Sequence, residues 1–350
     1  MREERECSID AFNAHAVNNN IPLSVLFELT YRCNLNCGHC YQVDRGSEEL
    51  CFSEVTGIID QLAAENCLFL TLSGGEVFVR EDFFDIARYA LKKGFALKVF
   101  SNGTLIDESV AHELACLHPL EVGVSIYGAD AVTHDQFTGM PGSFHRSVNA
   151  LKQLKHQGVL TVVKCLLMKE NMTQIGGIKA LAKEVGAILQ FDPIVVPKID
   201  GNRDPLQHEL TDTDLHRFFS LEIAEPNPAK EPNPRLSQPI ICRAGRDLCC
   251  ISPRGDIYPC MAFPITLGNL RKQSFAEIWR GVEAEKLRKL TPSDLHECVS
   301  CPDLNYCTRC WGLAAVESGD LLGPSQINCR IARIRHRISV ERAGNKIEMR

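Results

Sequence analysis

Three cysteines in one short loop constrain this chain more than any other feature of its sequence. Cys33, Cys37 and Cys40 have the spacing C-x3-C-x2-C and follow an apolar run at residues 24–30. A [4Fe–4S] cluster is usually held by four cysteine thiolates, so three thiolates on one loop leave one iron open to a small molecule. Zinc is a weaker alternative, because structural zinc needs four ligands and typically shows paired C-x2-C motifs. The spacing therefore predicts a cluster with one open iron, and chance placement of core cysteines is weaker still.

Apolar strands alternate with amphipathic helices over the first two hundred residues. In the helix expected from Ser53, apolar side chains fall at positions 55, 58, 59, 62 and 63, which is the spacing of one helical face. Such alternation predicts a parallel sheet covered by helices. An ordinary eight-unit barrel is the alternative, but only six units are found. We expect strands at 24–30, 68–72, 96–100, 120–127, 160–168 and 187–195, and helices near 53–63, 82–93, 107–117, 142–154 and 175–185.

Polar motifs follow several of these strands at their C-terminal ends, where parallel α/β folds gather their sites. Gly74 and Gly75 let the backbone come close to a ligand, and Glu76 adds a negative charge. A lone Gly-Gly-Glu is often an ordinary turn, so its place one strand after the cysteine loop favours a functional role. Hydroxyl and amide side chains at strand ends also serve as caps and turn formers. Those found here are Ser101, Asn102 and Ser125.

The last third of the chain carries a second cysteine pattern, after a proline-rich stretch at 225–235. Its spacing is C-x12-G-x4-C, then C-x2-C-x5-C-x2-C, then a final cysteine. The segment SPRGD favours a tight hairpin with Cys260 at its far end. A pair of zinc ribbons is the alternative, because two C-x2-C pairs would suffice. The cysteines are Cys242, Cys249, Cys250, Cys260, Cys298, Cys301, Cys307, Cys310 and Cys329.

Length and charge fit a large enzyme and exclude some other classes. A chain of 350 residues can fill one barrel domain and a smaller appendage. The formal net charge of −6 gives no reason to expect nucleic-acid or membrane binding. No apolar run approaches the roughly 18 residues of a membrane span, and the polar N-terminus does not read as a signal peptide. Many cysteines in such a chain favour reduced thiols and metal clusters, so we expect a cytoplasmic protein of an anaerobic or microaerobic host.

The cysteine loop, the Gly-Gly-Glu motif and the order of elements from 22 to 200 resemble the radical S-adenosylmethionine (SAM) enzymes. The resemblance implies a partial (β/α)6 barrel. It also implies that the open iron chelates the amino and carboxylate groups of SAM. Reductive cleavage then gives a 5′-deoxyadenosyl radical, which takes a hydrogen atom from the substrate. Cys33, Cys37 and Cys40 would be the catalytic cluster ligands.

The same resemblance assigns other residues to SAM. Glu76, with Gly74 and Gly75, would bind the methionine ammonium, although Val77 stands where the family usually has proline. His39 and Tyr41 flank the last cysteine, and the position of His39 lies beside the adenine in the family; His39 as an iron ligand is the alternative. Ser101, Asn102 and Ser125 would contact the ribose or carboxylate of SAM. For Lys164, binding the SAM carboxylate and pairing with a barrel acid are equally favoured.

The second cysteine pattern resembles the SPASM extension, which holds two auxiliary [4Fe–4S] clusters. Its last spacing is x2 here rather than the usual x3. By resemblance, the first auxiliary cluster would use Cys242, Cys260 and Cys310 with Cys249 or Cys250. Full ligation of this cluster favours a role in electron transfer. The second cluster would use Cys298, Cys301, Cys307 and Cys329.

These expectations give a domain layout. Residues 1–22 are an N-terminal extension, 23–224 the radical SAM barrel and 225–240 a proline-rich linker. Residues 241–332 are a small, loop-rich, cysteine-rich SPASM domain, and 333–350 a basic C-terminal tail.

We expect the chain to modify a ribosomally made peptide or protein, because the region Ser125–Phe144 resembles peptide-maturing members. A leader peptide would need a separate leader-binding protein or direct contact with the barrel, and the reductant would be a flavodoxin or ferredoxin. A haem-pathway enzyme acting on propionates is the alternative, followed by a non-catalytic iron–sulfur or zinc-binding interaction protein. Sulfatase maturation is disfavoured, because Met261 stands where those relatives carry a catalytic aspartate.

Overall fold

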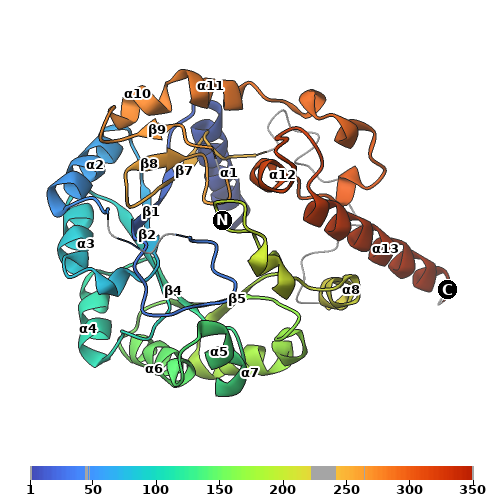
Figure 1. Ribbon diagram of the computed structural model, residues 1–350, viewed down its shortest axis with the longest axis horizontal. Coiled ribbons are helices and arrows are strands. Elements are labelled where there is room, and N and C mark those ends of the chain that lie inside the picture. The colour runs from blue at the N-terminus through green and yellow to red at the C-terminus, as the bar shows by residue number, and fades with distance from the viewer. Residues whose placement is uncertain (1, 44–45, 47, 222–241, 264, 349–350) are drawn as a thin grey trace.

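The computed structural model describes residues 2–43, 46, 48–221, 242–263 and 265–348. Six parallel strands form one open sheet in the order β6-β5-β4-β3-β2-β1, and the helices α2 to α7 lie in an arc outside it (Figure 1). The expected partial barrel is therefore confirmed, and the sheet is not closed. The strands are β1 (Ser24–Thr30), β2 (Phe69–Gly74), β3 (Ala96–Ser101), β4 (Glu121–Ser125), β5 (Thr161–Leu166) and β6 (Ile188–Asp192).

Five helices occupy the stretches where the sequence predicts them, and a sixth was not expected. The unexpected helix, α5, begins after Asp130, whose carboxylate accepts a hydrogen bond from the Thr133 N–H at 2.8 Å. It lies between β4 and the predicted helix at 142–154, and its C-terminal end reaches the cysteine loop. The helices are α2 (Phe52–Ala64), α3 (Phe83–Lys92), α4 (Glu108–Cys116), α5 (Ala131–Thr138), α6 (Ser143–His156) and α7 (Ile175–Val185).

Side chains of β1 alternate between the main core and the inside of the barrel. Val25, Phe27 and Leu29 are fully buried in the core between the sheet and its helices. Burial of a side chain of this size contributes about 1.5–3 kcal/mol. Because successive residues of a strand point to opposite faces, Glu28 and Thr30 point to the barrel interior. The first strand thus supplies both core packing and polar groups at the site.

The cysteine-rich segment continues the barrel sheet. β7 (Leu248–Ile251) pairs in parallel with β1, and Cys250 lies opposite Leu26 in the register. The expected hairpin is present, because β7 pairs antiparallel with β8 (Asp256–Tyr258), and Gly255 in the turn has a φ of +84°. β9 (Gly268–Asn269) completes the sheet. The helices that follow are α10 (Phe275–Trp279), α11 (Val282–Arg288), α12 (Trp311–Ser318) and α13 (Gln326–Glu348).

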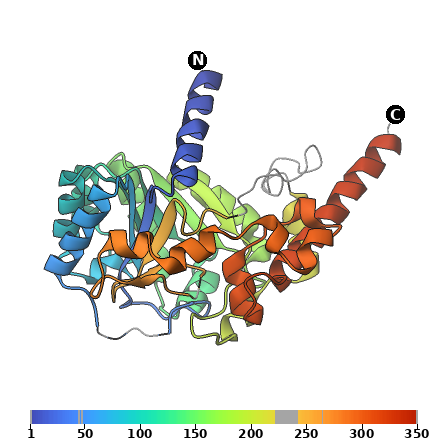
Figure 2. The same ribbon diagram turned by 90° about the horizontal axis from the view of Figure 1, so that it is seen from above.

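Both ends of the chain are helical. α1 (Arg2–Asn18) and the last part of α13 extend away from the body of the molecule (Figure 2). Residues 333–348 of the expected basic tail belong to α13, which packs against α8 (Asp212–Ser220). Arg330 of α13 pairs with Glu209 at 3.0 Å and with Asp212 at 2.9 Å. The linker expected at 225–240 lies outside the described residues.

Candidate active site

The loop that carries Cys33, Cys37 and Cys40 begins at the end of β1 and is held closely by the end of β2. The Gly75 N–H donates to the Thr30 carbonyl at 2.7 Å, and the Glu76 N–H donates to the Arg32 carbonyl at 3.0 Å. A Cβ atom on Gly74 or Gly75 would overlap these carbonyl oxygens, and Gly74 has a φ of +144°. The two glycines therefore permit a close approach of backbone to backbone, which fixes the start of the cysteine loop.

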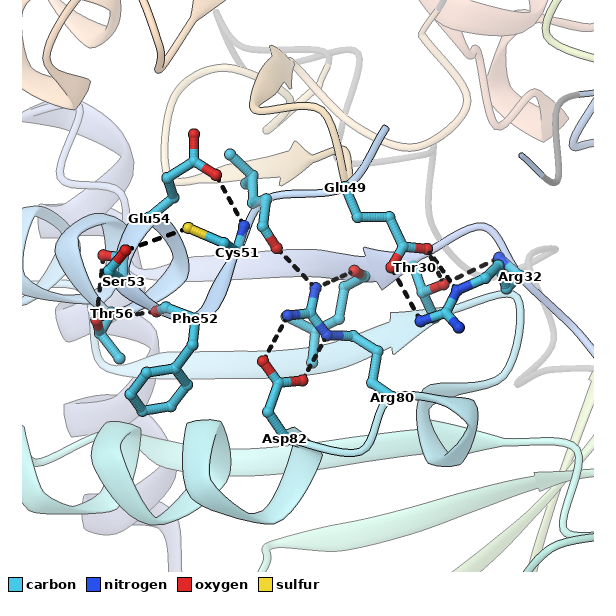
Figure 3. Close-up of polar contacts among 12 residues, drawn as sticks. Thr30, Arg32, Glu49, Cys51, Phe52, Ser53, Glu54, Thr56, Arg80 and Asp82 are labelled. Carbon is cyan, nitrogen blue, oxygen red and sulfur yellow. Dashed lines mark hydrogen bonds and ion pairs between the residues drawn. The ribbon is translucent and has the colours of Figure 1, made fainter. Parts of the chain in front are cut away.

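Arg80 and Glu49 close the base of this loop (Figure 3). The Arg80 guanidinium is 7% exposed and donates to the carbonyls of Leu29 and Leu50 at 2.9 and 3.0 Å. Asp82 orients the guanidinium through two hydrogen bonds of 2.8 and 2.7 Å. These contacts connect the segment before the loop, at Leu29, with the segment after it, at Leu50. Neither Arg80 nor Glu49 was singled out from the sequence, where an arginine after Gly-Gly-Glu carries no distinctive signal.

The far side of the loop rests on the C-terminal end of α5. The Asn36 N–H donates to the Thr138 carbonyl at 2.8 Å, and the Gly38 N–H donates to the Phe137 carbonyl at 3.1 Å. Within the loop, the Cys40 N–H donates to the Cys37 carbonyl at 3.2 Å. All three loop cysteines are partly exposed. The loop is therefore fixed on both sides, and its thiols lie where a cofactor can reach them.

Glu76 organises the ends of β2 and β3 beneath the loop. Its buried carboxylate accepts hydrogen bonds from Ser101 Oγ at 2.9 Å, from the Asn102 N–H at 2.7 Å and from the Phe78 N–H at 3.2 Å. Burial raises the pKa of Glu76 to about 7, and these hydrogen bonds oppose the increase. In this structure Glu76 therefore positions Ser101 and Asn102, and its expected contact with SAM stays a prediction.

Asn102 links this carboxylate to the first loop cysteine. Its Nδ2 donates to Asn34 Oδ1 at 2.9 Å and lies 3.8 Å from Cys33 Sγ. Its Oδ1 accepts from the Thr104 N–H at 2.8 Å, and Thr104 Oγ1 in turn accepts from Asn34 Nδ2 at 2.8 Å. The structure thus brings together Cys33, Glu76 and Asn102, which are far apart in sequence. Asn34 and Thr104 belong to the same network and were missed in the sequence.

His39 forms part of an aromatic wall beside the loop. Its ring lies edge-on to Tyr127 with 4.5 Å between centroids, and burial lowers its pKa to about 4. His39 Nδ1 is a buried atom that has no hydrogen-bond partner within the described residues. Burial, and then the charge of Cys37, raise the pKa of Tyr127, whose hydroxyl is hydrogen-bonded to Ser125. A neutral imidazole with an unused nitrogen suits a place beside a bound base.

Lys164 lies opposite Ser125 in the pairing of β4 with β5, and Tyr41 directly follows Cys40 in the chain. Lys164 Nζ lies 4.0 Å from the centroid of the Phe100 ring and donates to Gln190 Oε1 at 3.1 Å, and burial lowers its pKa. The Tyr41 hydroxyl donates to Glu28, a residue that is 4% exposed. Burial raises the pKa of Glu28 although Tyr41, Gln42 and Tyr31 hydrogen-bond to it. Glu28 was missed in the sequence, where one acid inside the apolar run 24–30 was the available signal.

The later cysteines gather in two groups. Burial, followed by the nearby thiols of Cys242 and Cys310, raises the pKa of Cys260 to about 12. Burial, followed by Cys329, Cys298 and Cys301, raises the pKa of Cys307 to about 12. The SPASM resemblance implies one auxiliary cluster for each group, and this assignment stays a prediction.

The donors in all three groups are thiols, which is the chemistry that iron–sulfur clusters require. Within the described residues, no three His, Cys, Asp or Glu side chains are placed to hold one metal ion. A single zinc ion needs its thiolates at about 2.3 Å, whereas a cubic cluster spreads them over separate irons.

No helix in the described parts of the chain combines the length and the apolar character needed to cross a membrane.

Two family models match the chain. The model of the radical SAM superfamily matches residues 27–182, and that of the SPASM iron-sulfur cluster-binding domain matches residues 242–311.

Curated relatives of two kinds align with most of the chain. The AdoMet-dependent heme synthase of Methanosarcina barkeri is 32% identical and covers 87% of this chain and 95% of the relative. The subtilosin biosynthesis protein AlbA of Bacillus subtilis is 30% identical, and the match covers 83% of this chain and 67% of AlbA. The mycofactocin maturase MftC of Mycolicibacterium smegmatis is 29% identical, with 82% and 77% covered.

Among solved structures, Streptococcus suis SuiB bound to its precursor peptide SuiA has a TM-score of 0.70. The match covers 93% of this chain and 80% of SuiB at 16% identity. At this identity the likeness concerns the fold alone.

Proposed function

Because the chain belongs to the radical SAM superfamily and carries a SPASM domain, we propose that it modifies a ribosomally made peptide or protein by radical chemistry. It is an enzyme whose cofactors are a [4Fe–4S] cluster with SAM and auxiliary iron–sulfur clusters. When bound, these cofactors supply reductive cleavage of SAM, hydrogen-atom abstraction and electron transfer. Peptide maturation is supported by the relatives AlbA and MftC, which align over more than four-fifths of this chain.

The residues around the loop take separate roles in this proposal. Cys33, Cys37 and Cys40 hold the SAM cluster, while Gly75 and Arg80 keep their loop in place. Glu76 holds Ser101 and Asn102 at the strand ends, where they can contact SAM. His39, with Tyr127 and Ser125 behind it, forms the wall for the adenine and excludes water from it. Lys164 contacts Phe100 and Gln190 within the barrel, so its binding of SAM has the weakest support.

We assign the auxiliary ligands to the two sets that the resemblance implies, with one choice added. Cys249 belongs to the main core, whereas the thiol of Cys250 lies near Cys260. We therefore assign Cys250 as the fourth ligand beside Cys242, Cys260 and Cys310. The second auxiliary ligands are Cys298, Cys301, Cys307 and Cys329. The cysteine-rich segment thus joins the barrel through the pairing of β7 with β1.

A cavity between the cysteine loop and the first auxiliary group is the observation that favours a peptide substrate over a tetrapyrrole. Its volume is about 100 Å³, and Glu28, Tyr41, Cys250 and Met261 are among its lining residues. Pockets that enclose drug-sized ligands usually measure about 300–1,000 Å³. This cavity suits one amino-acid side chain better than a macrocycle.

A tetrapyrrole is the second candidate substrate. The observation that favours it is the heme synthase relative, which has the higher identity and is covered over 95% of its length. In that case the macrocycle would need a wider opening than the cavity beside Glu28.

Isotope transfer separates the two candidates. The anaerobically reconstituted enzyme would be incubated with SAM, a reductant and either deuterated candidate peptides or a deuterated propionate-bearing tetrapyrrole. Deuterium in 5′-deoxyadenosine from a peptide is the expected result. Deuterium from the tetrapyrrole, with none from any peptide, would overturn the proposal.

Two partners complete the proposed function. A flavodoxin or ferredoxin would supply the electron. A separate leader-binding protein would present the peptide if the barrel does not hold the leader itself. Omission of each protein from the turnover assay tests its requirement.

A further inference from the structure

The cavity beside Glu28 lies where the barrel meets the cysteine-rich segment of the chain. Its walls come from β1, from the chain after Cys40, from the segment after β6, from the chain after β8 and from α12. Apolar side chains form much of the lining, as in sites that enclose part of a ligand. They include Val196, Ile199, Met261, Phe263, Leu313 and Val316.

Glu28 places a carboxylate in this cavity, and no cationic side chain in the described part of the chain pairs with it. Tyr41 donates to its Oε1, Gln42 Nε2 donates at 3.3 Å, and Cys250 Sγ lies 3.9 Å from Oε2. Lys198 is the one basic residue among the described residues that line the cavity, and its ammonium pairs with Asp204 at 3.7 Å. A cationic group that enters the cavity can therefore reach the Glu28 carboxylate at hydrogen-bond distance.

Aromatic rings share the walls with this carboxylate. Tyr31, Tyr41, Tyr258 and Phe263 all line the cavity. Aromatic faces attract ammonium and guanidinium groups, and the attraction is stronger when water is excluded. Aromatic rings around one buried carboxylate form a site for an organic cation with an apolar stem.

We propose that this cavity binds a basic side chain, lysine or arginine, of the peptide substrate. The stem of the side chain lies against Met261, Phe263 and Leu313, and its cationic end reaches Glu28. This inference rests on the proposed function, because it assumes a peptide.

The position of the cavity would place the bound side chain close to both groups of cluster cysteines. Tyr41 directly follows the cluster ligand Cys40, and Cys250 lies near Cys260 of the first auxiliary group. A side chain at Glu28 is therefore held between the SAM cluster loop and the first auxiliary cysteines. It anchors the peptide at the place where a radical formed on it can pass an electron to the SPASM domain.

Small probes test the cation site without substrate turnover. Binding of N-acetyl-lysine methylamide to the reconstituted full-length enzyme would be compared with that of N-acetyl-norleucine methylamide by ligand-observed NMR. The two probes differ in the ammonium group. We expect the lysine probe to bind about tenfold more tightly or better, since a hydrogen bond to a charged group is stronger than one between neutral groups. Equal affinities in the wild-type enzyme would overturn the proposal.

Two matched variants locate the effect. Glu28→Gln keeps the shape of the side chain and should remove the tenfold preference. Glu81→Gln, at an exposed position, should retain it. Iron content and the thermal midpoint establish that both variants are folded. A preference that survives Glu28→Gln would place the ammonium elsewhere and overturn the assignment.

The outcome is separable from that of the proposed function. If no peptide donates deuterium but the lysine preference holds, the peptide proposal fails and the cation site stands. If peptides donate deuterium and the preference is missing, the cation site alone fails.

Discussion

Cys249 and Cys250 are adjacent in sequence, yet their side chains point to opposite faces of β7. Cys249 packs in the main core near Cys67, and Cys250 lies 3.9 Å from Glu28 and near Cys260. Both side chains are 2% exposed, so burial alone does not distinguish them. The two cysteines are distinguished by the alternation of side chains along a strand, because the orientation of β7 is fixed by its pairing with β1. One of two adjacent cysteines is thus available to the first auxiliary group.

Replacing each of these cysteines should give different metal contents. Three clusters of four irons require about twelve irons per chain. Cys250→Ala should reduce this number to about eight by loss of the first auxiliary cluster. Cys249→Ala should keep about twelve irons and lower the free energy of unfolding by about 1–2 kcal/mol, because it removes core packing. Iron and sulfide analysis with urea unfolding checks both, and reversed iron losses would assign Cys249 instead.

Gly75→Ala should displace the cysteine loop. Its new Cβ would overlap the Arg32 carbonyl, which belongs to the backbone and cannot easily move. We expect loss of the SAM cluster and retention of about eight auxiliary irons. Gly57→Ala in α2 is the matched control, because nothing lies within 4 Å of its added Cβ. That change should stabilise the chain by about 0.4–1 kcal/mol. A Gly75→Ala enzyme with full iron and normal SAM cleavage would refute the close-approach role.

Glu76 should make stability depend on pH in a definite direction. Its pKa is about 7 when folded and near 4.5 in its ordinary environment, so the folded chain holds an extra proton between these values. Stability therefore falls as pH rises from about 4.5 to 7, by an amount of order 1–3 kcal/mol. In Glu76→Gln the decrease should be smaller. Urea midpoints at pH 5.5 and 8 measure it, and an equal decrease in both proteins would contradict the buried-acid account.

Met261→Ala should leave the radical step intact. Met261 lines the cavity beside Glu28 and is 48% exposed, and its thioether cannot accept a proton as a carboxylate does. Cleavage of SAM by the reduced enzyme without substrate should therefore proceed at the wild-type rate. A variant that no longer forms 5′-deoxyadenosine would show that Met261 shapes the SAM site.

Local sequence patterns predicted the helices and strands. The site contacts that these patterns did not predict depend on pairings between segments distant in sequence. The six strands and five of the helices follow from apolar periodicity, because each buries one face. The hairpin before Cys260 follows from its turn residues. In contrast, the contact of Cys250 with Glu28 and the choice of Cys250 over Cys249 depend on β7 lying beside β1. These segments are separated by about two hundred residues, and no local signal encodes their pairing.

The helix α5 illustrates the same limit. Its residues lack a strong apolar stripe, so periodicity did not reveal it. An Asp130 cap and contacts with the cysteine loop hold it in place. Its role in supporting the loop became visible only with the fold.

Formation of 5′-deoxyadenosine tests the central claim most directly. The anaerobically reconstituted enzyme would be reduced and given SAM, beside Cys33→Ala and a control, Cys116→Ala, at an exposed helical cysteine. We predict 5′-deoxyadenosine from the wild-type enzyme and from Cys116→Ala, and none from Cys33→Ala. Equal amounts from Cys33→Ala, or none from a wild-type enzyme with about twelve irons, would contradict SAM cleavage at this loop.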